Sequence, residues 1–326
     1  MDYAHLGRSG LLVSRVALGT MNFGDATDED TSFRVMDTAV EQGINLFDTA
    51  DVYGGPQSPD MAQGYGTSEE ITGRWLKRSG RRDDIVLATK VYQPMGRGPN
   101  DRRLSAYHIK RACEASLRRL QTDHIDLYQM HHVDRATPWE EIWQAMEQLA
   151  QEGKITYVGS SNFAGWDIAT AQMVARSRHF LGLVCEQSLY NLTNRAVEQE
   201  LVPALRYFGI GLIPWSPLAA GLLAVTPDAA SVRRKAPRVQ EQARIHADRL
   251  AAYQKLCSQI GHSPAEVALA WLLHQPAVPA VISGPRTPEQ LEANAGVASI
   301  TLDTGALAEL DHIWPGPGQA PQSYAW

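Results

Sequence analysis

The sequence contains few cysteines and no long apolar run. Its cysteines, Cys113, Cys185 and Cys257, are scattered along the 326 residues without CxxC spacing. They predict neither a disulfide framework nor a zinc site, and we expect no bound metal. No apolar stretch approaches the roughly 20 residues that a transmembrane helix needs, and the first residues lack the basic and apolar start of a signal peptide. These absences predict a cytoplasmic protein that does not associate with a membrane.

The chain also lacks an excess of positive charge. Its 36 acidic residues outnumber its 30 Lys and Arg residues, which gives a net charge of -6 at pH 7. Binding to nucleic acid or to an anionic membrane requires a clustered basic surface. A short basic cluster is typical of a solvated loop because acidic residues lie near it: Arg233, Arg234, Lys235 and Arg238. We therefore expect no nucleic-acid partner.

The usual fingerprints of nucleotide-binding and hydrolytic enzymes are missing as well. The Gly-Ile-Gly segment at residues 209–211 enters a predicted strand instead of following one, so it does not predict a Rossmann turn. The segment at residues 96–99 lacks the third glycine of that fingerprint. HExxH, Walker A and GxSxG motifs are absent. Any dinucleotide site in this chain must therefore be of another kind.

The sequence does contain a regular alternation of short apolar runs with segments of helical periodicity. The predicted strands cover residues 16–18, 44–47, 85–89, 125–130, 155–159, 183–185, 210–213 and 280–282. The predicted helices cover residues 28–41, 68–77, 105–120, 139–151, 165–175, 197–207, 247–260, 264–274 and 288–295. This alternation predicts an α/β fold, a (β/α)8 TIM barrel that forms a single domain over residues 1–326. An N-terminal β-hairpin over residues 2–13 and an extra C-terminal helix over residues 304–313 accompany the barrel.

Two long loops interrupt the alternation, at residues 54–66 and 222–246. Both follow predicted strands and so fall on the edge of the barrel where active sites lie, and loops of this length are more often functional than linkers. The tail at residues 315–326 begins with Pro-Gly-Pro-Gly, which excludes a regular element at its start. The sequence leaves open whether the tail is loosely ordered or folds across the barrel mouth.

Polar residues stand where three consecutive apolar runs end. Asp48 and Tyr53 follow the second predicted strand, Lys90 the third and His131 the fourth. In a (β/α)8 barrel, catalytic groups come from the ends of several strands at one edge. Taken singly, each residue has an ordinary structural explanation, such as a turn for Asp48 or a surface lysine for Lys90. Their joint placement after successive strands favours a shared site.

These four side chains predict a proton-transfer site. A phenol is a weak acid with a pKa of about 10, and an ammonium at about 4 Å stabilises its anion by on the order of 4 kcal/mol. We therefore expect Lys90, held by Asp48, to lower the pKa of Tyr53. His131 would orient a carbonyl and stabilise the negative charge on its oxygen. The set suits protonation of a carbonyl oxygen while a hydride, supplied by a cofactor, arrives at the carbonyl carbon.

His131 has a histidine neighbour, His132. Adjacent residues of a strand point to opposite faces, so the alternation predicts that the two rings do not line the same site.

Longer motifs show a resemblance that covers nearly the whole chain, from about residue 3 to about residue 310. The chain resembles the aldo-keto reductase superfamily through LGTMNFG (18–24), NLFDTADVYG (45–54), LATK (87–90), IDLYQMHH (125–132), GKITYVGSSNF (153–163), EQSLYN (186–191), PWSPLAAGLL (214–223) and ISGPRTPEQLEAN (282–294). The resemblance implies a (β/α)8 barrel that binds NADP(H) in an extended form. It also implies that Tyr53 is the general acid, that Asp48 and Lys90 tune it, and that His131 orients the carbonyl.

The same resemblance implies a set of cofactor-binding residues. Ser161, Asn162 and Gln187 match residues that bind the nicotinamide carboxamide, and Trp215 matches the aromatic that stacks on the nicotinamide ring. Arg286 lies in the segment that grips the ribose 2′-phosphate, and arginine meets a phosphate with two hydrogen bonds, which favours NADP over NAD. The complete expected set is Gly19, Thr20, Met21, Asp48, Ser161, Asn162, Gln187, Trp215, Ser216, Pro217, Leu218, Gly221, Ile282, Ser283, Gly284, Arg286, Gln290 and Asn294.

The resemblance fixes the reaction class better than the substrate. We expect a small-molecule aldehyde or ketone as partner, bound by Phe23, Tyr53, Tyr92, His131, His132 and Trp215, with Met21 as a further wall residue. One alternative is a 2,3-reductase or ketoreductase of a dTDP-deoxysugar, since residues 124–166 resemble bacterial reductases of that kind. A diphosphate would then meet Arg97, Arg102 and Arg103 near the mouth. An alternative of another class is a cofactor-binding regulatory subunit similar to potassium-channel β subunits. The sequence leaves the oligomeric state open.

Overall fold

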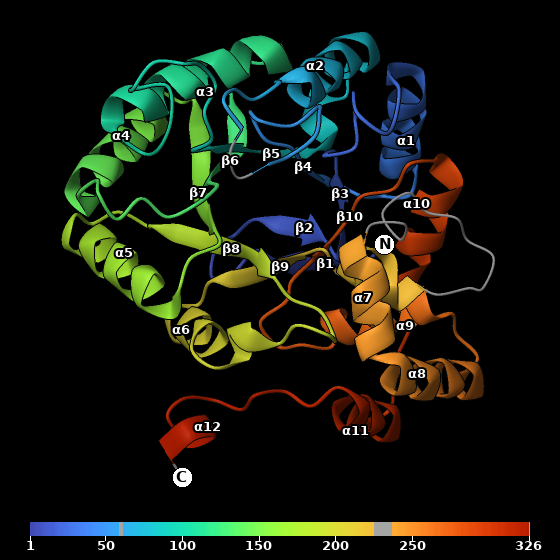
Figure 1. Ribbon diagram of the computed structural model, residues 1–326. Coiled ribbons are helices and arrows are strands. Elements are labelled where there is room, and N and C mark those ends of the chain that lie inside the picture. Colours follow the sequence, from blue (N-terminus) through green and yellow to red (C-terminus); the bar gives the residue numbers. More distant parts are fainter. Residues whose placement is uncertain (59–60, 225–236, 326) are drawn as a thin grey trace.

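Eight parallel strands form a nearly closed barrel at the centre of the protein (Figure 1). The computed structural model describes residues 1–58, 61–224 and 237–325. The strands follow the order β10-β3-β4-β5-β6-β7-β8-β9, and β9 lies beside β10. Their bounds are β3 Val16–Gly19, β4 Leu46–Asp48, β5 Val86–Val91, β6 Ile125–Met130, β7 Ile155–Ser161, β8 Leu183–Leu189, β9 Gly211–Trp215 and β10 Val281–Ser283. The predicted (β/α)8 barrel is confirmed.

Helices surround the barrel on its outside (Figure 1). They are α1 Glu29–Glu41, α2 Thr67–Ser79, α3 Ala106–Leu120, α4 Trp139–Gln151, α5 Gly165–Ser177, α6 Leu201–Phe208, α7 Pro237–Ile245, α8 Ala247–Ile260, α9 Pro264–Leu273 and α10 Pro288–Ala295. The predicted extra helix near the C-terminus is α11 (Thr304–Ile313). Side chains define several of their first turns: Asp28, Ser105 and Ser263 each accept a hydrogen bond from a backbone N–H of the helix that follows.

The predicted N-terminal hairpin is present and closes one end of the barrel. β1 (Tyr3–His5) pairs with the antiparallel strand β2 (Leu12–Ser14), and both lie in the middle of the ring in Figure 1. Leu6 and Val13 of this hairpin are fully buried in a cluster with Ala17, Leu46 and Leu127, which project from the barrel strands. The next residues along these strands, such as Phe47 and Tyr128, belong instead to the larger core between barrel and helices. The hairpin therefore plugs the end of the barrel opposite the carboxyl ends of its strands.

Two sequence predictions differ from the structure. The interval 222–246 was expected to be a loop, but residues 237–245 form α7, a helix of mostly polar residues whose Val239 and Ala243 pack against the core while only partly buried. The predicted helix 197–207 begins later, at Leu201, because a short 3-10 helix, Ala196–Glu198, precedes it. Residues 59–60 and 225–236 of the predicted loops lie outside the described residues. The second of these ranges includes Arg233, Arg234 and Lys235. Residues 54–58 and 61–66 contain no helix or strand, as predicted.

The C-terminal tail runs along the outside of the barrel (Figure 1). Its start is irregular, as predicted, and it ends in the short helix α12 (Gln322–Ala325). The backbone N–H of Ala320 donates to the carbonyl oxygen of Gln199, which fixes the tail beside the segment before α6. Within the described part of the chain, no helix has the length and apolar composition needed to cross a membrane.

Candidate active site

The side chains of Asp48, Tyr53 and Lys90 meet at the carboxyl ends of β4 and β5. The ammonium of Lys90 donates three hydrogen bonds: to Asp48 Oδ2 at 2.5 Å, to the Thr49 carbonyl oxygen at 2.9 Å and to Tyr53 Oη at 3.2 Å. The Lys90 side chain is fully buried, and its three N–H donors are all used. The juxtaposition expected from the ends of the apolar runs is present.

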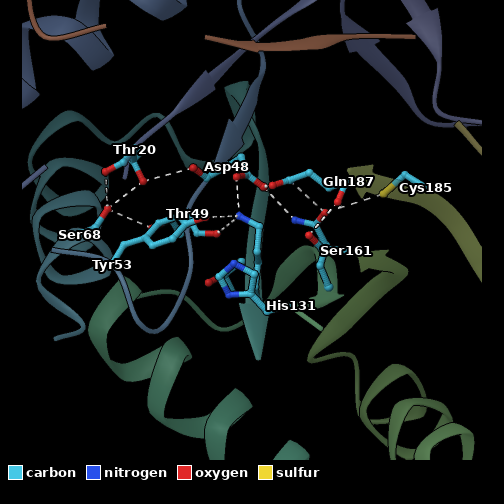
Figure 2. Close-up of polar contacts among 12 residues, drawn as sticks. Thr20, Asp48, Thr49, Tyr53, Ser68, His131, Ser161, Cys185 and Gln187 are labelled. Carbon is cyan, nitrogen blue, oxygen red and sulfur yellow. Dashed lines mark hydrogen bonds and ion pairs between the residues drawn. The ribbon is translucent and has the colours of Figure 1, made fainter. Parts of the chain in front are cut away.

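Two glutamines complete the surroundings of Asp48, and Figure 2 shows one of them, Gln187. Gln129 Nε2 donates to Asp48 Oδ1 at 2.8 Å, and Gln187 Nε2 donates to the same oxygen at 3.0 Å. Asp48 is thereby fixed from three strands, with both oxygens occupied. Gln129 was missed by the sequence analysis, although it is two residues before His131. Gln187, expected at the nicotinamide carboxamide, contacts Asp48.

The chain turns sharply after Tyr53, and this turn places the phenol. Gly54 has φ 117°, and a Cβ at this position would lie 2.4 Å from the Cβ of Thr67, so only glycine fits. The N–H of Ser68, in the first turn of α2, donates to the Tyr53 carbonyl oxygen at 3.2 Å. The Ser68 hydroxyl lies 2.8 Å from that of Thr20 and 3.1 Å from that of Thr49. These contacts tie the loop after β4 to the end of β3.

Burial dominates the acidity of the phenol. The Tyr53 side chain is almost completely enclosed, and this desolvation raises its pKa above the ordinary value of 10.0; Lys90 lowers the pKa, but by less. Lys90 thus acts on the phenol in the predicted direction, but burial outweighs it, because removing a phenolate from water costs more than one ammonium recovers. For Lys90, burial lowers the pKa, yet Asp48 and Tyr53 together raise it above 10.5. At neutral pH the site holds a protonated phenol against a charged ammonium.

His131 is a neutral imidazole at the same place. Burial, followed by the nearby Lys90 and His132, lowers the pKa of His131 well below its ordinary value. Its ring meets that of Tyr53 edge to face, with centroids 5.7 Å apart. Its Nδ1 is buried and has no hydrogen-bond partner among the described residues. An imidazole in this state has one N–H donor and one acceptor, as is required to hold a neutral carbonyl.

The predicted separation of His131 and His132 was wrong. Their rings stack with centroids 5.4 Å apart and an interplanar angle of 18°. β6 ends at Met130, so the alternation of a strand no longer applies to the next two residues. His132 also contacts the Tyr92 ring, at 5.3 Å between centroids. His131, His132 and Tyr92 form one continuous aromatic wall.

A polar network extends from this wall to β9. Asn162 Nδ2 donates to the His131 carbonyl oxygen at 3.2 Å, and Asn162 Oδ1 accepts from Trp215 Nε1 at 3.1 Å. Ser161 donates to the Gln187 carbonyl oxygen at 2.8 Å. Figure 2 shows Ser161 and Gln187 beside Asp48, on the other side from Tyr53 and Ser68. The residues expected at the nicotinamide therefore lie next to the residues expected to transfer the proton.

The segment after β9 is conformationally unusual. Ser216, Ala219 and Ala220 have φ values of 52°, 49° and 56°, in the left-handed region that non-glycine residues seldom adopt, and Gly221 follows with φ 93°. Asn191 Nδ2 holds the Ser216 carbonyl oxygen at 2.9 Å, and the Ser216 hydroxyl accepts from the N–H of Ala220 at 3.2 Å. Strained backbone of this kind clusters at ligand sites. The expected Ser216, Pro217, Leu218 and Gly221 all lie in this segment.

The residues expected at the adenosine end gather at the end of β10 and the start of α10. Asn294 Nδ2 donates to Ser283 Oγ at 2.7 Å, and Gln290 Oε1 accepts from the Arg286 backbone N–H at 2.9 Å. Asn22 Nδ2 donates to the Gly284 carbonyl oxygen at 2.9 Å, which joins this region to the loop after β3. Gly19 lies against Ile282: a Cβ there would be 2.6 Å from its Cγ2. Within the described chain, no hydrogen bond or ion pair engages the guanidinium of Arg286.

The structure corrects part of the expected set of substrate-binding residues. Phe23 is fully buried in the core between barrel and helices, so it has no surface to offer a substrate. Tyr53 packs instead with Ala50 and Val52 against partly buried methionines, namely Met21, Met61 and Met95. Met61 and Met95 were missed because they lie in loops outside the motifs. Their flexible side chains suit an adaptable apolar wall.

An open pocket of about 510 Å³ lies beside this site. It is bounded by the segment after β7, including Asn162, by Ser188 and Leu189 of β8, and by Ala320 and Tyr324 of the tail. None of Asp48, Tyr53, Lys90 and His131 lines it. The pocket thus adjoins the nicotinamide side of the site rather than the reacting groups.

Comparisons with known proteins agree with this arrangement. A family model described as Aldo/keto reductase family matches residues 15–315. Over the full length of both chains, 335 aligned residues, the protein is 49% identical to one from Bacillus subtilis (strain 168) named "Uncharacterized oxidoreductase YrpG". It is 31% identical over 338 residues, 99% of this chain and all of the other, to a "Probable voltage-gated potassium channel subunit beta" of Arabidopsis thaliana. A protein of the same name from Oryza sativa subsp. japonica is 33% identical over 90% of each chain.

Proposed function

The chain belongs to the aldo/keto reductase family, whose members include oxidoreductases, and from this premise we propose that it reduces the carbonyl group of an aldehyde or ketone to an alcohol with NADPH. The observation that carries the proposal is the hydrogen bond of 3.2 Å between Lys90 Nζ and Tyr53 Oη inside a buried cluster with Asp48. A protonated phenol next to a fixed cation is a proton donor whose anion is stabilised as it forms.

Each side chain then has a defined part in the reaction. When bound, NADPH would supply the hydride for the carbonyl carbon. Tyr53 donates its phenolic proton to the carbonyl oxygen, and Lys90 stabilises the phenolate that remains. Asp48 keeps Lys90 charged and in place through their 2.5 Å contact. His131 binds the carbonyl oxygen with a neutral N–H and so holds the carbon toward the hydride donor.

The residues present fit NADP(H). The guanidinium of Arg286 has no partner in the described chain and stands next to the N-terminal turn of α10, where a 2′-phosphate is favoured by charge and by the helix dipole. Ser161, Asn162 and Gln187 offer polar groups for a carboxamide, and Trp215 offers an aromatic face. The left-handed segment from Ser216 to Gly221 would meet the pyrophosphate side. Gly19, Thr20, Met21, Ile282, Ser283, Gly284, Gln290 and Asn294 complete the proposed cofactor site.

We propose that Met21, Tyr92, His132 and Trp215 line the substrate site together with Met61 and Met95. The wall is mainly aromatic and thioether, so it favours an apolar or aromatic carbonyl compound. Three statements remain predictions from the sequence. The protein is located in the reducing cytoplasm, it forms a single domain over residues 1–326, and it has no nucleic-acid or membrane partner.

A second candidate is a nucleotide-linked deoxysugar as substrate. Arg97, Arg102 and Arg103 lie exposed in the loop after β5, next to Tyr92, and within the described residues their guanidinium groups have no hydrogen-bond or ion-pair partner. Such groups would meet a diphosphate.

A third candidate, a cofactor-binding regulatory subunit, is favoured by the two relatives named as potassium-channel subunits. The complete set of Asp48, Tyr53, Lys90 and His131 argues for turnover, because binding alone does not require a proton donor.

One assay separates the three candidates. Oxidation of NADPH is followed with a panel of aromatic aldehydes and diketones and, separately, with dTDP-keto-deoxysugars. We expect turnover with the simple carbonyl compounds; turnover with the nucleotide sugars alone would favour the second candidate. Tight NADPH binding without oxidation by any carbonyl would favour the regulatory candidate and contradict the proposed function.

A further inference from the structure

Glu186 is a buried carboxyl group on β8, directly before Gln187. We propose that Glu186 is a positioning residue: it clamps the turn Ser161-Asn162-Phe163, so that Asn162 joins the catalytic wall to Trp215. The proposal deepens the proposed function, because the clamped turn carries the residues expected at the nicotinamide. Glu186 itself lies one residue from Gln187 along a strand, hence on the opposite face, and acts through other residues.

Three donors converge on the Glu186 carboxyl group. The backbone N–H of Phe163 donates to Oε1 at 3.1 Å, and the Ser188 hydroxyl donates to the same oxygen at 2.6 Å. The Ser160 hydroxyl donates to Oε2. The side chain is fully buried, so these groups replace water around it. Glu186 thus joins the end of β7, the turn after it and the end of β8 at one point.

The clamped turn would not keep its conformation unaided. Asn162 has φ 62°, in the left-handed region, which non-glycine residues adopt only where the surroundings enforce it. Its own N–H donates to the Gln187 carbonyl oxygen at 3.1 Å, and the next N–H, that of Phe163, donates to Glu186. These two successive bonds hold the turn from both sides of Asn162. A relaxed turn would move the Asn162 side chain away from its partners.

Those partners are parts of the proposed active site. The Asn162 amide bonds the His131 carbonyl oxygen at 3.2 Å and Trp215 Nε1 at 3.1 Å. It thereby fixes the backbone of the residue that orients the carbonyl and the indole that faces the nicotinamide. Ser188, another donor to Glu186, directly follows Gln187, which holds Asp48. Loss of the Glu186 acceptor would therefore loosen the cofactor side of the site while leaving Tyr53, Lys90 and Asp48 in place.

A carboxyl group suits this place because its two oxygens can accept all three hydrogen bonds. Burial raises the pKa of Glu186 to about 7, while its hydrogen bonds from Ser160, Ser188 and the backbone oppose that rise. Near neutral pH the group is therefore only partly ionised, and in either form its oxygens accept hydrogen bonds from the two hydroxyls and the N–H.

The test compares Glu186→Ala, which removes the acceptor, with Glu186→Gln, which retains a carbonyl oxygen for Phe163 and Ser188. We expect Glu186→Ala to weaken NADPH binding by roughly tenfold, the loss that about one hydrogen bond implies. The same variant should speed hydrogen exchange of the peptide covering residues 161–165. Glu186→Gln should stay within about threefold of the unmodified protein in both measurements. The bound NADPH of either variant should still be oxidised, so the effect appears in KM for NADPH more than in kcat.

Asp167→Ala is the matched control. Asp167 accepts a hydrogen bond from the N–H of Ala164 at 3.0 Å, in the same segment, but the hydrogen bonds of Phe163 and Asn162 go to other residues. We expect its removal to leave NADPH affinity nearly unchanged. An equal loss in Asp167→Ala and Glu186→Ala would mean that general loosening of the segment is enough, and it would overturn the proposal. The proposal would also be overturned if Glu186→Ala changed neither NADPH affinity nor hydrogen exchange. The same holds if Glu186→Gln lost as much NADPH affinity as Glu186→Ala.

Two further readouts keep the test decisive. If Glu186→Ala is not recovered folded, Glu186→Met fills a similar volume without an acceptor and takes its place, with the same expected results. In the unmodified protein the Phe163 amide should exchange slowly; exchange as fast as that of an exposed loop amide contradicts the clamp without any variant. If the protein bound no NADPH, the proposed function would be refuted. Hydrogen exchange needs no cofactor, so it would still decide whether Glu186 holds the turn.

Discussion

Lys90 is the residue on which the electrostatics of the site depend. Its buried ammonium holds Asp48 Oδ2 at 2.5 Å and Tyr53 Oη at 3.2 Å, so it connects the charge of the site to its proton donor. The sequence predicted which residues meet, because each follows an apolar run. It did not predict the direction of the phenol pKa, because the balance between burial and a neighbouring charge depends on how completely the folded chain excludes water.

Replacing Lys90 should expose that dependence. Lys90→Met leaves the Asp48 carboxylate buried without a countercharge, so we expect the free energy of unfolding to fall by about 3–5 kcal/mol and turnover to be lost. Adding Asp48→Asn removes the unpaired charge and should restore part of the stability but none of the activity. Urea unfolding of the two variants checks this, and a double variant no more stable than Lys90→Met would contradict the account of the ion pair.

Arg286 should decide which nicotinamide nucleotide binds. Arg286→Ala removes the charge proposed to meet the 2′-phosphate, so we expect NADPH affinity to fall roughly 10- to 100-fold and NADH affinity to change little. The control is Arg206→Ala on the exposed surface of α6, which should affect neither nucleotide. Titration of both nucleotides into each variant gives the answer. Equal losses of NADPH and NADH in Arg286→Ala would refute the role in phosphate binding.

Glu186 should make stability depend on pH in a defined direction. Burial raises its pKa from 4.5 to about 7, so between these values the folded protein holds a proton that the unfolded chain has released. Its contribution to stability is therefore fully present below pH 4.5 and is lost as the pH rises through 7; the change is on the order of 3 kcal/mol.

Glu186→Gln does not titrate at this position, so it isolates the effect. The unfolding free energy of the unmodified protein minus that of Glu186→Gln should decrease from pH 4.5 to pH 8. Other titrating groups cancel in this difference. A difference that stays constant or grows with pH would show that Glu186 does not carry the raised pKa.

At the scale of helices and strands, periodicity located most elements to within a few residues. Strands buried on both faces, such as β6, stand out as apolar runs, and the helices that cover them show one apolar face. α7 was missed because it is short and mostly polar, with no fully buried residue. His132 was misplaced because the sequence does not show that β6 ends at Met130. Gln129 and Glu186 were missed for a related reason: a single strand does not indicate which neighbour its polar residues will meet.

The hairpin β1–β2 should contribute to stability through the residues that enter the barrel. Leu6 is fully buried in the barrel interior, whereas Leu12 of the same hairpin is 48% exposed. Leu6→Ala should therefore lower the free energy of unfolding by about 2–5 kcal/mol, because it leaves a cavity, and Leu12→Ala by less than about 1 kcal/mol. Chemical denaturation of the two variants measures both values. Similar small losses would contradict the role of the hairpin as a plug.

At the scale of the whole molecule, the barrel explains why residues far apart in sequence make one site. Asp48, Lys90, Gln129 and Gln187 stand on four strands, and their side chains meet because parallel strands end at a common edge. The count and alternation of elements were enough to predict this topology. Local patterns do not predict which side chains of different strands bond to one another, where the tail lies beside α6, or the adjoining pocket. These features depend on long-range packing.

The most direct test of the central claim is a single turnover of enzyme-bound NADPH with an aromatic aldehyde, compared between the unmodified protein and Tyr53→Phe. The substitution removes only the hydroxyl that donates the proton. We expect NADPH to bind with nearly unchanged affinity and the rate of its oxidation to fall by about 100- to 10,000-fold. Oxidation by Tyr53→Phe at a rate close to that of the unmodified protein would show that another group supplies the proton.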